Sequence, residues 1–309
     1  MGLNSTKSAL TNAEYSLTLS SPNDFYRNLS TIQGEFHLNV RSKLRIEKEI
    51  RIDLIGQLLE NKKYASRSNR NSSQFNNTPN NNNNNNIFLT YSCSLITSHE
   101  NGTARTIKHQ QVNYPFRIPL GSNLPPSCEF KEFCVVYYLE IYHDGRLLPN
   151  THKRITIAPQ TPQIIVPLPC KVTGSGDVTM ICSLPKSFYS GRDCPVVPMS
   201  MSITNPKQKQ IKAVTAQLMQ TVSLNGIKRE NEIFTALLNE IAENTKENEV
   251  NTKCELVLPA NLSPTYVPNE TGQPDNVPSI AITYEFRITA QMKGATTPNI
   301  RLSVPIGIE

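Results

Sequence analysis

Tryptophan is absent from the 309 residues, and hydrophobic residues make up a modest 38% of the chain. The core must therefore be built from aliphatic side chains, phenylalanine and tyrosine. No apolar run approaches the ~20 residues of a membrane-spanning helix, and no hydrophobic signal-peptide core opens the chain. We therefore expect a protein of the cytoplasm, in which thiols stay reduced.

Motifs for metal binding and catalysis are also missing. The seven cysteines are odd in number and form no C-x-x-C pair, so neither a zinc site nor a disulfide framework is indicated, and buried free thiols are expected. The five histidines lack the H-E-x-x-H spacing, and Gly174-Ser175-Gly176 lacks the lysine of a phosphate-binding loop. No G-x-S-x-G elbow occurs. We predict a non-enzymatic protein that needs no metal or other cofactor.

The chain has no dense basic stripe, so we expect no nucleic-acid partner. Its formal net charge is only +6, and residues 1–70, with 11 Lys/Arg against 7 Asp/Glu, carry +4 of it. A mildly basic N-terminal region would favour binding to anionic lipids or to phosphorylated partners. An ordinary solvated surface explains the same charge equally well.

Long helices are disfavoured by 22 prolines spread along the chain. Apolar and polar residues instead alternate with period two, which is typical of half-buried strands. The apolar members of five such segments are Phe36, Leu38 and Val40; Ile50, Ile52 and Leu54; Val135, Tyr137, Leu139 and Ile141; Ile280, Ile282, Tyr284, Phe286 and Ile288; and Ile300, Leu302, Val304 and Ile306. We predict an all-β protein of two tandem antiparallel, immunoglobulin-like β-sandwiches.

Two changes in composition divide the chain. Residues 61–86 are rich in asparagine and poor in apolar side chains, which predicts a disordered loop within the first sandwich. Recurring prolines near residue 162 indicate a stiff connection between domains. The expected organisation is a flexible N-terminus over 1–13, a first sandwich over 14–161 and a second over 162–309.

One segment, within residues 230–243, does not follow the strand pattern. Ile233, Phe234, Leu237, Leu238 and Ile241 have the i, i+3, i+4 spacing of an amphipathic helix. A strand from Thr235 to Ile241 is the alternative, and the sequence leaves both open.

Several short motifs follow one another in a definite order over nearly the whole chain. In the first half these are Phe25-Tyr26, Ile32–Leu38 (IQGEFHL), Leu54–Gly56 (LIG), Tyr114–Leu120 (YPFRIPL) and Leu124–Ser127 (LPPS). In the second half they are Phe188–Gly191 (FYSG), Met199–Ile203 before Asn205-Pro206-Lys207, Ile211–Val214 (IKAV), Leu218–Gln220 (LMQ), Leu256–Pro259 (LVLP) and Val304–Gly307 (VPIG). This order resembles the arrestin family over nearly the whole chain. The resemblance implies an arrestin fold with N-terminal and C-terminal arrestin domains.

The resemblance also implies a function. It suggests an adaptor or scaffold that links membrane cargo or receptor tails to endocytic, endosomal or signalling machinery. The looser resemblance to the retromer subunit with an arrestin fold suggests, as an alternative, a structural module of a cytosolic complex without its own lipid anchor. No P-P-x-Y motif for recruiting WW-domain ubiquitin ligases occurs, and the chain stops at Glu309, directly after its last expected strand. We therefore expect neither ligase recruitment nor the clathrin-adaptor motifs of an arrestin tail.

The N-terminus carries the one motif with covalent chemistry. Met1-Gly2-Leu3-Asn4-Ser5-Thr6 fits M-G-x-x-x-[ST], so that removal of Met1 would expose Gly2 for myristoylation. A single myristoyl chain binds membranes only marginally, with an association constant on the order of 10⁴ M⁻¹. A second signal is needed, and the candidates are the basic residues Lys62, Lys63, Arg67 and Arg70. We predict peripheral association with the plasma membrane or endosomes.

Overall fold

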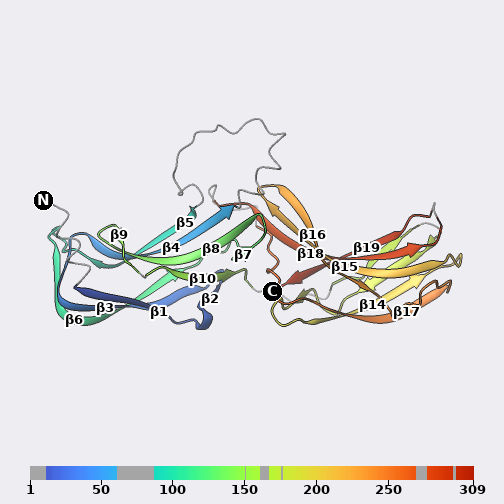
Figure 1. Ribbon diagram of the computed structural model, residues 1–309, viewed down its shortest axis with the longest axis horizontal. Coiled ribbons are helices and arrows are strands. Elements are labelled where there is room, and N and C mark those ends of the chain that lie inside the picture. The colour runs from blue at the N-terminus through green and yellow to red at the C-terminus, as the bar shows by residue number, and fades with distance from the viewer. Residues whose placement is uncertain are drawn as a thin grey trace, which may run out of the picture. The chain divides into compact units, whose positions relative to one another are not determined.

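The computed structural model describes residues 12–60, 87–149, 151–160, 167–174, 177–268, 277–294 and 297–309. Within these ranges the regular elements are strands, apart from the short 3₁₀ helix η1 (Pro22–Asp24). The chain divides into two compact units, the first comprising Met1–Gln160 with Thr271–Pro278 and the second Thr161–Glu270 with Ser279–Glu309. The all-β prediction is confirmed (Figure 1).

The first unit is a sandwich of a small and a large sheet (Figure 1). The small sheet has the order β1 (Ala13–Leu19), β3 (Thr31–Ile46) and β6 (Arg105–Pro119). The large sheet has the order β2 (Phe25–Arg27), β10 (Lys153–Ala158), β8 (Phe133–His143), β4 (Glu49–Glu60) and β5 (Ile87–Thr97), with β7 (Cys128–Glu129) and β9 (Arg146–Leu147) paired to β8. All these pairs are antiparallel except β2 with β10.

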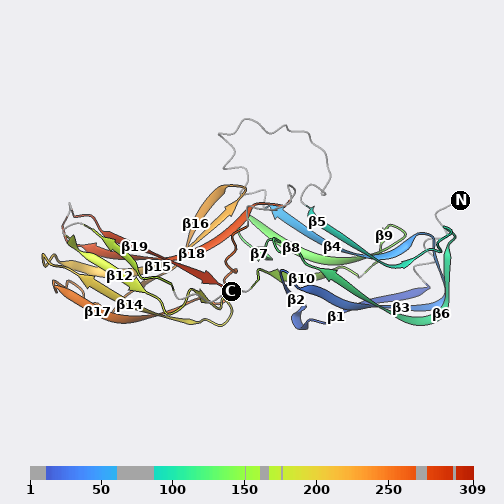
Figure 2. The same ribbon diagram turned by 180° about the vertical axis from the view of Figure 1, so that it is seen from behind.

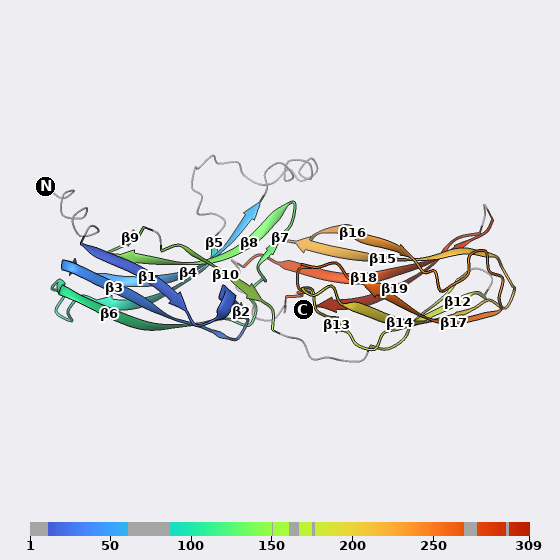
Figure 3. The same cartoon turned by 60° about the horizontal axis from the view of Figure 1, so that its bottom comes forward.

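The second unit repeats this plan with nine strands (Figures 2 and 3). One sheet has the order β11 (Cys170–Thr173), β12 (Thr179–Ser183), β14 (Val196–Thr204) and β17 (Glu249–Val257). The other has the order β13 (Phe188–Tyr189), β19 (Ile300–Ile308), β18 (Ile280–Met292), β15 (Ile211–Leu224) and β16 (Ile227–Leu237). The tight β15–β16 hairpin turns at Asn225 and Gly226, which both have positive φ, as the favoured two-residue hairpin turn requires.

The apolar members of all five alternating segments are buried, as the sequence predicted. Successive side chains of a strand point to opposite faces, so each segment sends one row into its sandwich. Within one sheet, side chains of different strands on this buried face also meet as ring contacts. The Phe88 and Tyr137 rings pack edge-on with centroids 5.7 Å apart, and Phe36 stacks on Tyr15 at 6.2 Å.

A Phe-Tyr pair closes each sandwich in the same way. Tyr26 of β2 pairs in parallel with Ile157 of β10, and Tyr189 of β13 pairs in parallel with Ile308 of β19. Both tyrosines are buried. The motif pattern locates these pairs, but only the register shows that each joins the edge of a sheet in parallel orientation.

Of the two alternatives left open within residues 230–243, the helix is wrong, and the strand is present but ends at Leu237 instead of running from Thr235 to Ile241. Residues 227–237 form the edge strand β16, and Leu238 and Ile241 lie in the following turn, where the Leu238 amide donates to the Val214 carbonyl at 2.9 Å. In the pairing with β15, Leu218 stands opposite Phe234 but Met219 stands opposite Glu232, so Ile233 is an extra residue without a partner. Such a bulge breaks the period-two alternation, which is why the segment imitates a helical spacing.

Three other predictions have different outcomes. Ala13, assigned by the sequence to the flexible N-terminus, is the buried first residue of β1. All seven cysteines are free; Cys128, Cys182 and Cys254 are buried as expected, but Cys194 is exposed. The loop prediction for 61–86 falls outside the described residues.

Candidate functional site

The site residues predicted from the sequence, Gly2 and the basic residues Lys62, Lys63, Arg67 and Arg70, lie outside the described residues. Their roles stay predictions. In the described ranges, no group of three or more His, Cys, Asp or Glu side chains could hold a metal ion. No helix of the described part is long and apolar enough to cross a membrane.

The buried thiols are poor nucleophiles. Burial raises the pKa of both Cys128 and Cys182 to about 12, and burial likewise raises that of Cys254 to about 11. A thiol attacks as its thiolate, so these cysteines remain protonated and unreactive at neutral pH. They act as small apolar core residues.

A polar network lies on the outer face of the large sheet of the first unit. Asp53 on β4 and Glu140 on β8 stand directly opposite each other, and they are only 3% and 9% exposed. Arg51 Nε donates to both carboxylate oxygens of Asp53, at 3.0 and 3.2 Å. The Tyr142 hydroxyl donates to Glu140 Oε2 at 2.7 Å, and His152 Nδ1 lies 3.2 Å from Glu140 Oε1.

These contacts explain how two carboxylates are tolerated side by side. Arg51 supplies the opposite charge for Asp53, while Tyr142 supplies a hydroxyl donor for Glu140. Desolvation and the bond to Glu140 together raise the pKa of Tyr142, so its hydroxyl stays protonated and keeps donating. Since the members satisfy one another, we assign the network a structural role.

Arg51→Ala is expected to lower the free energy of unfolding by about 2 kcal/mol. Removing one partner of a fully buried pair costs ~3–5 kcal/mol because the other charge is left uncompensated, but the Arg51 side chain is 31% exposed, and solvent screening reduces the loss. The measurement is urea unfolding followed by far-UV circular dichroism.

Arg45→Ala is the matched control, because Arg45 faces Glu47 at 3.7 Å with its side chain 65% exposed. Exposed pairs of this kind are worth ~0–1 kcal/mol. Equal losses for Arg51→Ala and Arg45→Ala would contradict the structural role of the network.

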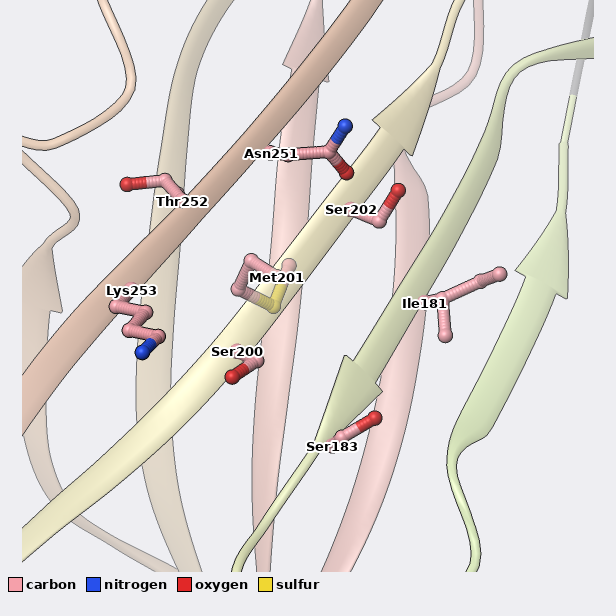
Figure 4. A pocket seen from close by; sticks show the side chains of 8 residues that line it. All are labelled: Ile181, Ser183, Ser200, Met201, Ser202, Asn251, Thr252 and Lys253. Atoms are coloured by element: carbon pink, nitrogen blue, oxygen red, sulfur yellow. The ribbon is translucent and has the colours of Figure 1, made fainter.

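A shallow hollow of about 550 Å³ lies on the four-stranded sheet of the second unit (Figure 4). We call it the β14–β17 hollow. Its lining residues come from β12, β14 and β17 and are Ile181, Ser183, Ser200, Met201, Ser202, Asn251, Thr252 and Lys253. Figure 4 shows the Ser200 and Ser202 side chains on β14 between those of β12 and β17.

The strand register builds this hollow. Ser200 stands opposite Ser183 on one side and Lys253 on the other. Ser202 likewise stands between Ile181 and Asn251. The lining thus offers hydroxyls, one amide and one ammonium group, without a carboxylate to act as a general base. It suits hydrogen bonding to a partner rather than bond-breaking chemistry.

Comparison with family models agrees with the tandem sandwiches. The model for the arrestin (or S-antigen) N-terminal domain matches residues 15–160, and the model for the arrestin (or S-antigen) C-terminal domain matches residues 175–308. The chain belongs to the arrestin family. A search of curated proteins finds no match. Arrestins are generally non-enzymatic adaptors that act through protein partners.

Sequence reasoning missed the β14–β17 hollow of this arrestin. Ser200 and Ser202 alternate with the buried Met199, Met201 and Ile203, and this pattern alone identifies an outer face. Which strands lie beside that face depends on long-range pairing. The sequence therefore predicts the outer face of this strand but not which strands lie on either side of it.

Proposed function

We propose that this arrestin is an adaptor at the cytoplasmic face of the plasma membrane or of endosomes. It would link membrane cargo or receptor tails to endocytic, endosomal or signalling machinery. The observation that carries the proposal is the match of both arrestin domains, which together span nearly the whole chain. Residues of the described outer faces offer hydrogen-bonding groups to partners, as in the β14–β17 hollow.

Membrane residence would depend on two weak signals. A myristoyl chain on Gly2 supplies one, and the basic residues between 62 and 70 supply the other. Each basic residue near an anionic surface contributes ~1 kcal/mol. Since a single acyl chain holds a protein only marginally, loss of either signal should release a large part of the protein.

Gly2→Ala tests the anchor. We expect the substitution to move most of the protein from the membrane to the soluble fraction, because alanine at this position is not acylated. The measurement is membrane flotation of the full chain from cells, together with mass spectrometry of the N-terminal peptide. An unmodified N-terminus in the wild-type protein would refute the anchor.

Charge neutralisation tests the second signal. Changing Lys62, Lys63, Arg67 and Arg70 to Gln should weaken binding to phosphatidylserine vesicles and remove much of its salt dependence, because salt screens charge attraction and not acyl burial. The matched control neutralises four exposed basic residues elsewhere in the first unit, namely Lys43, Lys48, Arg105 and Lys108. Equal effects of the two variants would show that net charge alone matters and would refute this second signal.

A further inference from the structure

The sheets of the described residues end in edges that differ in how well they are protected against strand addition. Pro115 and Pro119 interrupt the edge strand β6, and proline cannot donate to an added strand. Two register shifts distort β5 against β4, and one distorts β16. The edge strands β2, β11 and β13 have only two to four residues. Prolines, bulges and short length are three of the devices that protect edges, and charged side chains are a fourth.

The edge strand β17 has none of the first three devices, although it carries charged side chains. The shorter edge strand β1, with seven residues, lacks them too. It pairs with β14 over nine consecutive residues without a register shift, and its sequence from Glu249 to Val257 contains no proline. It is the last strand of its sheet, and no described strand pairs with its other side. A regular, proline-free edge of this length is a template for one more strand.

The hydrogen bonds at both ends of β17 show which of its backbone groups are free. The Leu258 amide donates to the Pro195 carbonyl at 3.0 Å, and the Asn205 amide donates to the Asn248 carbonyl at 2.6 Å. Hydrogen-bonded and non-hydrogen-bonded pairs alternate along an antiparallel ladder. Even-numbered residues of β17 therefore use their backbone groups on β14, whereas the odd-numbered residues direct theirs away from the sheet.

The same odd-numbered residues place their side chains on the outer face, where all five are exposed: Glu249, Asn251, Lys253, Glu255 and Val257. Their order is acid, amide, base, acid and apolar. Lys253 and Asn251 also line the β14–β17 hollow (Figure 4). Free backbone groups and a defined side-chain order thus coincide on one edge.

We propose that β17 captures an extended peptide segment of a cargo protein as an added antiparallel strand. This inference rests on the proposed adaptor function and names the class of partner. Backbone hydrogen bonds would supply the affinity, and alternate side chains the specificity. Directly opposed residues favour opposite charges and disfavour like ones. Read from its N-terminus, the peptide therefore carries apolar, basic, acidic, hydroxyl or amide, and basic residues at positions 1, 3, 5, 7 and 9.

A second copy of this chain fits the edge less well than such a peptide. Two β17 strands centred on each other would place Lys253 against Lys253. Shifting the register to pair Lys253 with Glu255 would set the polar Asn251 against the apolar Val257. A third register, which pairs Lys253 with Glu249 and Asn251 with itself, matches the charges but overlaps the two strands only from Glu249 to Lys253 and leaves Glu255 and Val257 without a partner strand. None of these registers satisfies the whole edge, so an extended peptide is the better partner.

The test uses a fluorescein-labelled nonapeptide with valine, lysine, aspartate, serine and lysine at positions 1, 3, 5, 7 and 9 and threonine between them. Fluorescence anisotropy measures its binding to the full chain. We expect Lys253→Glu to weaken binding at least tenfold, and a peptide with lysine at position 5 to recover affinity for that variant. Lys171→Glu, on the opposite edge strand β11, should leave the affinity within about twofold.

Backbone methylation tests strand addition itself on the unaltered protein. An N-methyl group at peptide position 5 removes a donor that faces β17, so binding should be lost. The same group at position 4 points away from β17 and should be tolerated. Equal binding of the two methylated peptides would overturn strand addition, as would no measurable binding of the parent peptide.

Sedimentation velocity completes the test. A dimer of the full chain that Lys253→Glu dissociates would overturn the peptide proposal in favour of a second copy. Membrane flotation of Lys253→Glu separates this inference from the proposed function. If Lys253→Glu floats with membranes as the wild-type protein does but no longer binds the peptide, β17 is supported as the peptide site. If the Gly2→Ala test fails, the anchor is refuted and peptide capture still stands.

Discussion

Leu238→Asp is expected to lower the free energy of unfolding by at least about 4 kcal/mol. Leu238 is 1% exposed in the turn after β16, so the change removes ~2–3 kcal/mol of apolar burial. It also leaves a carboxylate in the core without a partner, which costs several kcal/mol more or forces the group to take up a proton. Urea unfolding followed by far-UV circular dichroism measures the loss.

The neighbouring variant Leu237→Asp is the matched control. Leu237 is the last residue of β16 and is 41% exposed, so we expect a loss of no more than ~1 kcal/mol, the span of strand propensities. In an amphipathic helix both leucines would lie on the apolar face, and both variants would be damaging. Similar losses for the two would therefore argue against the strand-and-turn structure.

Phe286→Ala is expected to cost about 3–5 kcal/mol, the usual range for emptying a buried aromatic site. Phe286 is fully buried in a row that crosses its sheet from Phe234 through Leu218 to Val304. Its ring meets that of Phe234 edge-on, with centroids 6.4 Å apart. The hydrogen-exchange rates of the β18 amides should rise as the free energy of unfolding falls, since these amides exchange through unfolding of the sheet.

Phe234→Ala provides the comparison, because Phe234 is only half-buried on the edge strand β16. The Phe234→Ala variant removes the same ring contact but leaves a smaller cavity. We therefore expect the free energy of unfolding to fall clearly less than for Phe286→Ala. Equal losses would mean that the edge strand contributes as much to the core as the central strand β18.

The candidate sites were only partly predictable. The sequence indicated an N-terminal acylation motif and a basic cluster, which are local patterns that need no fold to be recognised. The buried network of Arg51, Asp53 and Glu140 was not foreseen. Asp53 and Glu140 are far apart in the chain, and only the β4–β8 register sets them against each other. The β14–β17 hollow was missed for the same reason.

The sequence by itself determined the class of fold. The period-two alternation of a strand can be recognised from neighbouring residues alone, and the five alternating segments supply core residues to both sandwiches. The order of motifs from Phe25 to Gly307 determined the family. Tertiary structure alone decided which strands pair and in which register, because pairing joins residues distant in the chain. It also decided that residues 227–237 form a strand with a bulge at Ile233, and that β17 ends its sheet with a regular, open edge. Local periodicity cannot specify either, since a bulge and an edge are defined only by the partner strand that is present or absent.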